Sequence, residues 1–354
     1  MAGAGSAPAA VSVATPSGPS MCGAAPSVKA LLAALKAPAW VDVLKTSDAD
    51  AGATTTVLLA TNVTGATFDK FEAAAERLHC SMRLEDGSIF VYDLPLARHD
   101  VPSMKILELA GRFQWAQAQR RVPPVRNEFT FEGSTLFSVG AAGRRAADQT
   151  IRPDGNLSQF PPVIVEVGAC ETQAELDKDA QFWLTDPRTL GQVHAVITVK
   201  VYQRRPHPTA AGAIPGPFAA VAGLYLRGRG GPGVGRTVNP GLGYAGHVGA
   251  ALAPVIPVSV ISFGGVHVAP GLALQASQGL GAPLTGYVSG GGVAPCSAAG
   301  LAAYALTVPA THMYAGVPAA RLPPGFPDGG NDWTLDLYDV VDALQRAPSF
   351  FAGT

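Results

Sequence analysis

Residues 162–168, with the sequence PVIVEVG, decide the fold. The run is almost entirely β-branched, which is typical of a strand buried on both faces of a sheet. Glu166 stands in the middle of it. Burying a lone carboxylate costs several kcal/mol unless it is paired or bound to a cation. The sequence therefore predicts that a charged group or a metal ion faces Glu166.

The nearest candidate for that group is Asp154, which follows Pro153 and lies 12 positions before Glu166. A tight connection through residues 158–161 would fold residues 151–157 antiparallel to the strand of Glu166, with both carboxylates at one edge. Two converging carboxylates and water bind Mg²⁺ or Mn²⁺. Such an ion can activate water and stabilise a phosphoryl transition state. A simpler interpretation stays open, in which Asp154 is a turn residue and Glu166 pairs with a buried lysine.

The flanking sequence predicts alternating helices and strands. Helices are expected at 27–37 with Ser27 as N-cap, from Thr67 over 68–78, from His99 or Pro102 to about 120, and at 171–184. Residues 55–60 are expected to form a strand or a short buried segment, 80–94 a hairpin turning at Asp86-Gly87, and 128–139 a strand or hairpin. A loop is expected at 140–150 and a strand at 193–203. This order indicates an α/β (α+β) fold, a mixed sheet flanked by helices.

Composition divides the chain into four parts. Residues 1–26 are predicted to be a disordered leader, 27–205 the core, and 206–255 a flexible insertion rich in Gly, Ala and Pro. Residues 256–350 are expected to add strands at 256–263 and 303–308 and a strand running into a helix at 333–346. These C-terminal elements are expected to pack on the core.

Charge and cysteine content limit the class of protein. The chain has a net charge of -1 and 14% charged residues, which excludes a globally basic nucleic-acid binder but allows a local basic patch. Its four cysteines are scattered without a metal-binding spacing, so a zinc site is not expected. Free thiols fit an intracellular location, with nucleus or cytoplasm favoured and an organelle possible. No apolar run reaches the ~18 residues of a membrane span, so no membrane association is expected.

Residues 67–200 carry a series of motifs in the order found in one nuclease family. The series comprises the helix at Phe68-Asp69-Lys70-Phe71-Glu72, the hairpin at Leu84-Glu85-Asp86-Gly87, His99 before the next helix, Pro153-Asp154, Val165-Glu166-Val167, and Asp177-Lys178 ahead of Phe182-Trp183. Together they resemble bacterial restriction endonucleases of the Uma type and their eukaryotic relatives, within the PD-(D/E)XK superfamily. Later strands at Leu306-Thr307-Val308-Pro309 and Leu335-Asp336-Leu337 resemble those of the eukaryotic members.

The resemblance implies a restriction-endonuclease-like fold and a Mg²⁺- or Mn²⁺-dependent nuclease acting on DNA, with Asp154 and Glu166 as metal ligands. The nuclease pattern has a lysine two positions after the second carboxylate, where this chain has Gly168. A cation there offsets transition-state charge. Lys178, which matches the family's helix lysine, is the first candidate to replace it. Lys200, at the end of the strand 193–203, is the second, and either could instead be a solvated lysine.

Three further groups could complete such a site. Glu108 is the one carboxylate expected in the middle of the helix that follows His99, and a helix-borne glutamate often completes such nuclease sites. Arg152 and the pair Arg144-Arg145 flank the site and could contact phosphates. Each has a plain alternative, as a surface, capping or loop residue. Two functions therefore remain open, an active nuclease and a catalytically degenerate nuclease fold that binds nucleic acid or protein.

Overall fold

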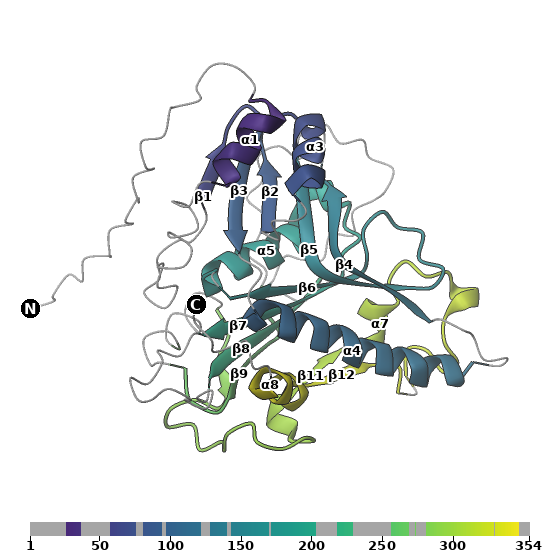
Figure 1. Cartoon of the computed structure of the whole chain (residues 1–354). Helices are drawn as coiled ribbons and strands as arrows, with labels where there is room; N and C mark the ends of the chain where they lie inside the picture. Colours follow the sequence, from purple (N-terminus) through teal and green to yellow (C-terminus); the bar gives the residue numbers. More distant parts are fainter. Residues whose placement is uncertain are drawn as a thin grey trace, which may run out of the picture.

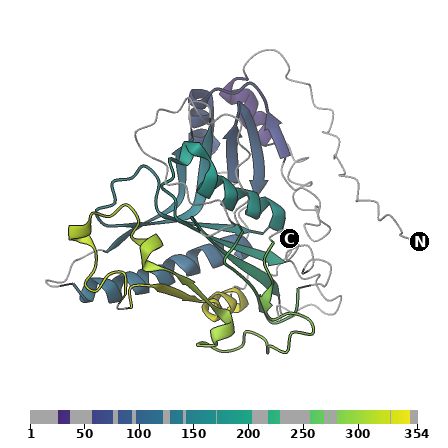
Figure 2. The same cartoon turned by 180° about the vertical axis from the view of Figure 1, so that it is seen from behind.

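A computed structural model of the whole chain shows a large mixed sheet with helices on both faces (Figures 1 and 2). It describes residues 26–36, 57–75, 81–93, 97–121, 128–139, 143–169, 171–202, 218–228, 256–268, 273, 281–328 and 330–346. No helix among these residues is both long and apolar enough to cross a membrane.

The main sheet has ten strands, in the order β1-β3-β2-β5-β6-β7-β8-β9-β10 with β4 paired to β5. Their bounds are β1 Val57–Ala60, β2 Ser81–Glu85, β3 Ser88–Asp93, β4 Phe129–Ser138, β5 Arg144–Pro153, β6 Val163–Gly168, β7 Ala195–Tyr202, β8 Ala219–Leu226, β9 Ser259–Gly264 and β10 Thr285–Gly286. Strands β6 and β7 run parallel and are joined through a helix, whereas β5, β6's other neighbour, is antiparallel to it. The central strands β6, β7 and β8 are buried along their whole length.

The two faces of the sheet are covered by different helices. One face carries α4 (Ala97–Gln119) and α8 (Leu337–Arg346), in front of the sheet in Figure 1. The other carries α5 (Gln173–Thr185), which lies in front in Figure 2. Helices α1 (Val28–Leu35) and α3 (Gly65–Ala75) cover the β1-β3-β2 end.

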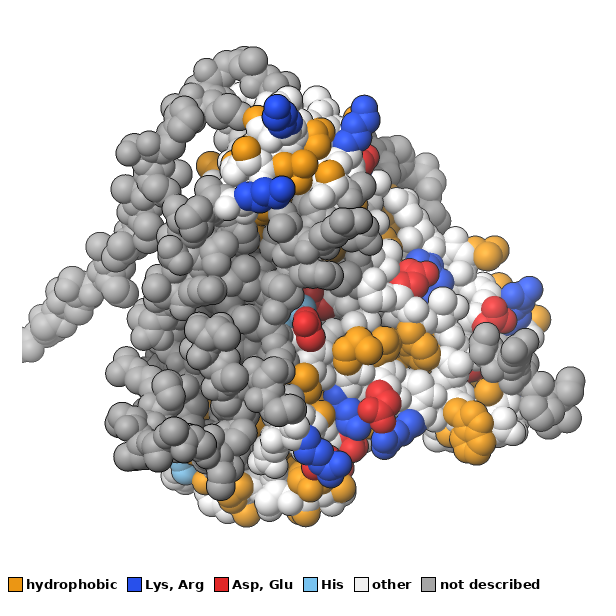
Figure 3. Space-filling view, viewed as in Figure 1, with side chains coloured by type: hydrophobic (Ala, Val, Ile, Leu, Met, Phe, Trp, Pro, Cys, Tyr) orange, Lys and Arg blue, Asp and Glu red, His pale blue; other side chains and the backbone are white. Residues whose placement is uncertain are grey.

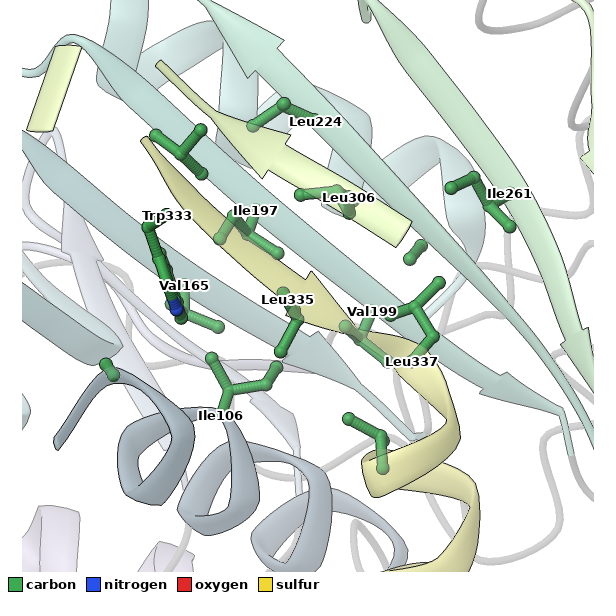
Figure 4. Packing of buried hydrophobic residues seen from close by; sticks show 14 of the residues in the cluster. Ile106, Val165, Ile197, Val199, Leu224, Ile261, Leu306, Trp333, Leu335 and Leu337 are labelled. Atoms are coloured by element: carbon green, nitrogen blue, oxygen red, sulfur yellow. The ribbon is translucent and has the colours of Figure 1, made fainter. Parts of the chain in front are cut away.

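The C-terminal segment closes the α4 face. Strands β11 (Ala305–Val308) and β12 (Trp333–Asp336) pair antiparallel and lead into α8, and α7 (Ala310–Met313) follows β11. Figure 4 shows Leu306, Trp333 and Leu335 of this layer packed over Val165, Ile197 and Val199 of the sheet. Short 3-10 helices η3 (Pro187–Thr189), η5 (Ala302–Tyr304) and η6 (Ala319–Arg321) complete the described elements.

Most of the expected elements are present. The Ser27 hydroxyl accepts a hydrogen bond from the Ala30 N–H, the hairpin turns at Asp86-Gly87 with positive φ at both residues, and the strand and helix near the C-terminus are continuous. The mixed α/β class, a large mixed sheet flanked by helices, is confirmed. Helix α3 begins before Thr67, because the Thr64 hydroxyl accepts the N–H of Thr67.

Two predictions were wrong. Residues 140–150 were expected to be a loop, but β5 begins at Arg144. Within the expected insertion 206–255, β8 is a buried strand, because its run of small and apolar residues fits between β7 and β9. Residues 1–25 and the remainder of the insertion, apart from Phe218 and residues 227–228 beside β8, lie outside the described residues.

Candidate functional site

The candidate site lies where β5 and β6 separate. Their ladder pairs Ile151 with Val163 and ends at Gln149 opposite Val165. One residue further, Asp148 lies beside Glu166: the Asp148 N–H donates to Glu166 Oε2 at 3.4 Å. The Val167 N–H donates to Asp148 Oδ2 at 2.6 Å, so a carboxylate takes the place of a main-chain acceptor there. Two carboxylates from adjacent strands are thereby brought together.

The environment of Glu166 disfavours its charged form. Its side chain is almost fully buried in the sheet, and burial raises its pKa to about 8, with the neighbouring Asp148 carboxylate adding to the rise. Arg145 and two hydrogen bonds, from the Trp183 indole and the Asp148 main chain, act in the opposite direction. Near neutral pH the metal-free site therefore holds a proton on Glu166.

Helix α4 reaches the same point from the opposite face. His99 Nε2 lies 3.2 Å from Asp148 Oδ2, and His99 Nδ1 lies 2.9 Å from Asp100 Oδ1. One turn further along the helix, the Ser103 hydroxyl accepts a hydrogen bond from Gln149 Nε2 at 2.9 Å. These contacts hold the start of α4 over β5. Asp148 and His99 each keep about an eighth of their side chain exposed, so the site opens toward solvent here.

Lys200 is a buried cation next to Gly168, the position at which the nuclease pattern has a lysine. Strands β6 and β7 pair in register, which places Lys200 next to Gly168 and Thr198 next to Glu166. The Lys200 ammonium donates to the Ala169 carbonyl at 3.0 Å and is only 1% exposed. A Cβ at position 168 would stand 2.8 Å from the Leu176 side chain of α5, so a lysine there would require the Leu176 side chain to shift. The neighbouring strand offers the nearest alternative position.

The structure corrects the pairing of Asp154 with Glu166. Asp154 follows β5 in an exposed turn, six residues beyond Asp148, which corresponds to roughly 20 Å of extended strand. Its main-chain N–H donates to the Glu128 carbonyl. The antiparallel arrangement of the two strands was expected correctly, but the ladder register puts Asp148, and not Asp154, beside Glu166.

The other two candidates also lie away from the pair. Lys178 is exposed on α5, whereas Lys200 is buried beside Gly168. Glu108 lies about 180° around α4 from His99 at 100° per residue, and it pairs with Lys105 and Arg112 on the outer side of the helix. Hydrophobic side chains also gather over α4 on this outer side (Figure 3).

Three residues of the site were not chosen from the sequence. Asp148 was missed because residues 144–150, RRAADQT, show no apolar alternation that would indicate a strand. The signal in the sequence was the β-branched pair Thr150-Ile151 before Pro153. A strand predicted there could have been extended toward the N-terminus to include Asp148. His99 and Trp183 were noted for their order along the chain, but no pattern in the sequence predicts their contacts with the carboxylates.

The carboxylate oxygens of Asp148 and Glu166 supply part of the ligand set that a hard divalent cation needs. Carboxylate oxygens suit Mg²⁺ and Mn²⁺, and a cation would compensate two carboxylates that otherwise repel each other. Among the described residues, however, no group of three or more His, Cys, Asp or Glu side chains is arranged to hold a metal. Asp148 and Glu166 would therefore act as two ligands, with water or substrate oxygens supplying the others. The chain matches no protein-family model and no curated protein.

Proposed function

We propose that this protein is a divalent-metal-dependent nuclease of restriction-endonuclease-like topology, acting on DNA. The observation that supports the proposal most is the pair formed by the buried Glu166 and the partly exposed Asp148 on adjacent strands, at the point where the strands separate. The order of elements around it, helix α4, then β4, β5, β6, α5 and β7, is compatible with the order of the motifs in the resemblance. The site residues that differ from the sequence prediction are Asp148 in place of Asp154 and Lys200 in place of Lys178.

Each residue has a defined part in this proposal. Asp148 and Glu166 would hold Mg²⁺ or Mn²⁺, which when bound activates water and offsets charge on the phosphoryl group. Lys200 holds a fixed positive charge on the same face as Glu166. His99 orients Asp148 through Nε2. Burial of Glu166 and Lys200 keeps water from screening these charges.

A direct test is a cleavage assay on single- and double-stranded DNA with Mg²⁺ or Mn²⁺. Wild type should cleave, excess chelator should stop cleavage, and Glu166→Ala should lower the rate at least 100-fold. Glu108→Ala is the matched control, because it removes a glutamate from the outer side of α4 and should leave the rate within twofold. Lys200→Met should lower the rate strongly, whereas Lys178→Ala should not. Absence of metal-dependent cleavage in wild type would contradict the proposal.

One observation favours the alternative of a degenerate nuclease fold. Both carboxylates already accept hydrogen bonds from the protein, Glu166 from Trp183 and Asp148 from Val167, so the pair is partly satisfied without a metal. In that case the chain would bind DNA without cutting it, and added Mn²⁺ would not raise the thermal unfolding midpoint. A gel-shift measurement beside the cleavage assay separates the two functions.

A further inference from the structure

Trp183 contacts the carboxylate pair directly, on the Glu166 side. It lies on the inner side of α5, is fully buried, and its indole Nε1–H donates to Glu166 Oε1. Indole is a donor only, so this bond favours one orientation of the carboxylate. The other oxygen, Oε2, is left to face Asp148, whose N–H it accepts.

Aromatic neighbours fix the indole ring from several sides. Phe137 of β4 meets it edge to face at 5.8 Å between centroids, and Phe182 does so at 5.3 Å. Phe160, in the connection between β5 and β6, lies 6.4 Å away. Such contacts restrict ring rotation, and each adds about 0.5–1.5 kcal/mol beyond its buried area. The donor atom is therefore held in place independently of Glu166.

Arg145 ties this aromatic cluster to the strand of Asp148. Its guanidinium carbon lies 4.3 Å from the Phe182 ring centroid and 5.8 Å from that of Trp183. The same group pairs with Asp179 of α5 and, at 3.3 Å, with Glu85 of β2. Because Arg145 belongs to β5, it links α5 to the strand that carries Asp148. Moving the helix would therefore break a buried ion pair and an indole hydrogen bond together.

We propose that Trp183 is the positioning residue for Glu166. Its indole N–H holds Oε1, so that Oε2 faces a divalent cation together with Asp148. The Arg145–Asp179 ion pair fixes α5, and with it the indole, relative to β5. This inference rests on the proposed metal-dependent function. The nuclease pattern of two carboxylates and a lysine does not include a tryptophan that orients one of the carboxylates. The positioning role also explains why a bulky tryptophan, and not a smaller aromatic residue, faces a carboxylate in the sheet.

The test replaces the donor and keeps the ring. Trp183→Phe retains aromatic packing and removes the N–H. Trp333→Phe makes the same change at a second fully buried tryptophan, on the opposite face of the sheet. Mn²⁺ affinity of the full chain is measured by calorimetry. A hydrogen bond to a charged group that is lost should weaken Mn²⁺ binding about tenfold in Trp183→Phe and leave it unchanged in Trp333→Phe. Unchanged or tighter binding in Trp183→Phe would overturn the inference.

A second readout works without metal and separates this inference from the proposed function. In ¹⁵N-labelled protein the Trp183 indole N–H resonance is identified by its loss in Trp183→Phe. Glu166→Gln should shift this resonance, because a neutral amide replaces a carboxylate acceptor, and should leave the Trp333 resonance in place. If wild type binds no Mn²⁺ but the shift is seen, the metal function fails and the positioning contact stands. If the resonance does not move, Trp183 does not position Glu166.

Discussion

The two faces of strands β6 and β7 differ sharply, although both are buried. Toward α4 and α8 the strands present only apolar side chains: Val163, Val165, Val167, Ala195, Ile197, Val199 and Val201. Toward α5 the same strands present Glu166, Gly168, Thr198 and Lys200 among apolar neighbours. Figure 4 shows the first face closed by β11, β12 and α8. One face contributes stability, and the other carries charges whose burial is costly.

This difference teaches where to look for function in a sheet buried on both sides. Apolar side chains stabilise the fold wherever they are buried, whereas a buried Glu166 with a raised pKa and a buried Lys200 persist only where other groups compensate them. The polar residues recur at every second position, so one face of two adjacent strands collects them. The proposed site is that face, at the end where β5 separates.

The largest effect on stability is expected on the apolar face. Ile197→Ala leaves a cavity beneath the C-terminal layer and should lower the free energy of unfolding by about 2–5 kcal/mol. Leu58→Ala is the control, because Leu58 of the edge strand β1 is 41% exposed and should cost less than about 1 kcal/mol. Urea unfolding measures both. Equal losses would contradict the assignment of this face as the main core.

The second prediction concerns the polar face and pH. The folded-state pKa of Glu166 is raised to about 8 from 4.5, so the folded protein binds one more proton than the unfolded chain between these values. Stability is therefore greatest below pH 4.5 as far as this group is concerned, and it falls as pH rises through 8. Between pH 6.5 and 7.5 the loss should be at most about 1.4 kcal/mol.

Glu166→Gln removes that titration and should flatten the pH dependence. The variant should equal or exceed wild type in metal-free stability at pH 8, because no charge has to be buried. Urea unfolding at pH 6.5, 7.5 and 8.5 measures the difference. A variant that is less stable than wild type at every pH would show that Glu166 is ionised and well compensated in the folded state.

The smallest change in stability is expected from a substitution at the start of α5, the helix that covers the polar face. Thr172 and Glu175 form a capping box at the start of α5, each side chain accepting the other's main-chain N–H. Thr172→Ala should cost about 1 kcal/mol. Because the cap lies about three turns from Trp183, Mn²⁺ affinity should change less than twofold. A larger loss of affinity would show that the whole helix, and not the Trp183 contact, sets the site.

Much of the fold follows from local sequence signals. The Asp86-Gly87 turn, the β-branched run around Glu166 and the strand running into a helix at 333–346 were predicted from local sequence, and the structure confirms them. The first half of β5 and the whole of β8, which were not predicted as strands, carry no such signals. Residues 144–150 are mostly polar or small, and β8 lies in a stretch whose Gly and Ala content is typical of a linker. Both are strands because their neighbours pair with them.

Of the carboxylate pair, Glu166 was predicted from the sequence and Asp148 was not. Glu166 could be identified because a carboxylate inside a β-branched run is conspicuous. Its partner depends on ladder register, which follows from pairing between strands and cannot be read from the spacing of two carboxylates. Choosing Asp154 assumed a short connection at residues 158–161, whereas the ladder aligns Gln149 with Val165. The choice between Lys178 and Lys200 depended on burial, which the helix pattern alone did not resolve.

The most direct test of the account compares two aspartates on one strand and its adjoining turn. Mn²⁺ is titrated calorimetrically into wild type, Asp148→Asn and Asp154→Asn. We expect wild type and Asp154→Asn to bind Mn²⁺ with equal affinity. Asp148→Asn should weaken binding at least 30-fold, because Asp148, and not Asp154, lies beside Glu166. Loss of binding in Asp154→Asn with binding retained in Asp148→Asn would contradict the central claim.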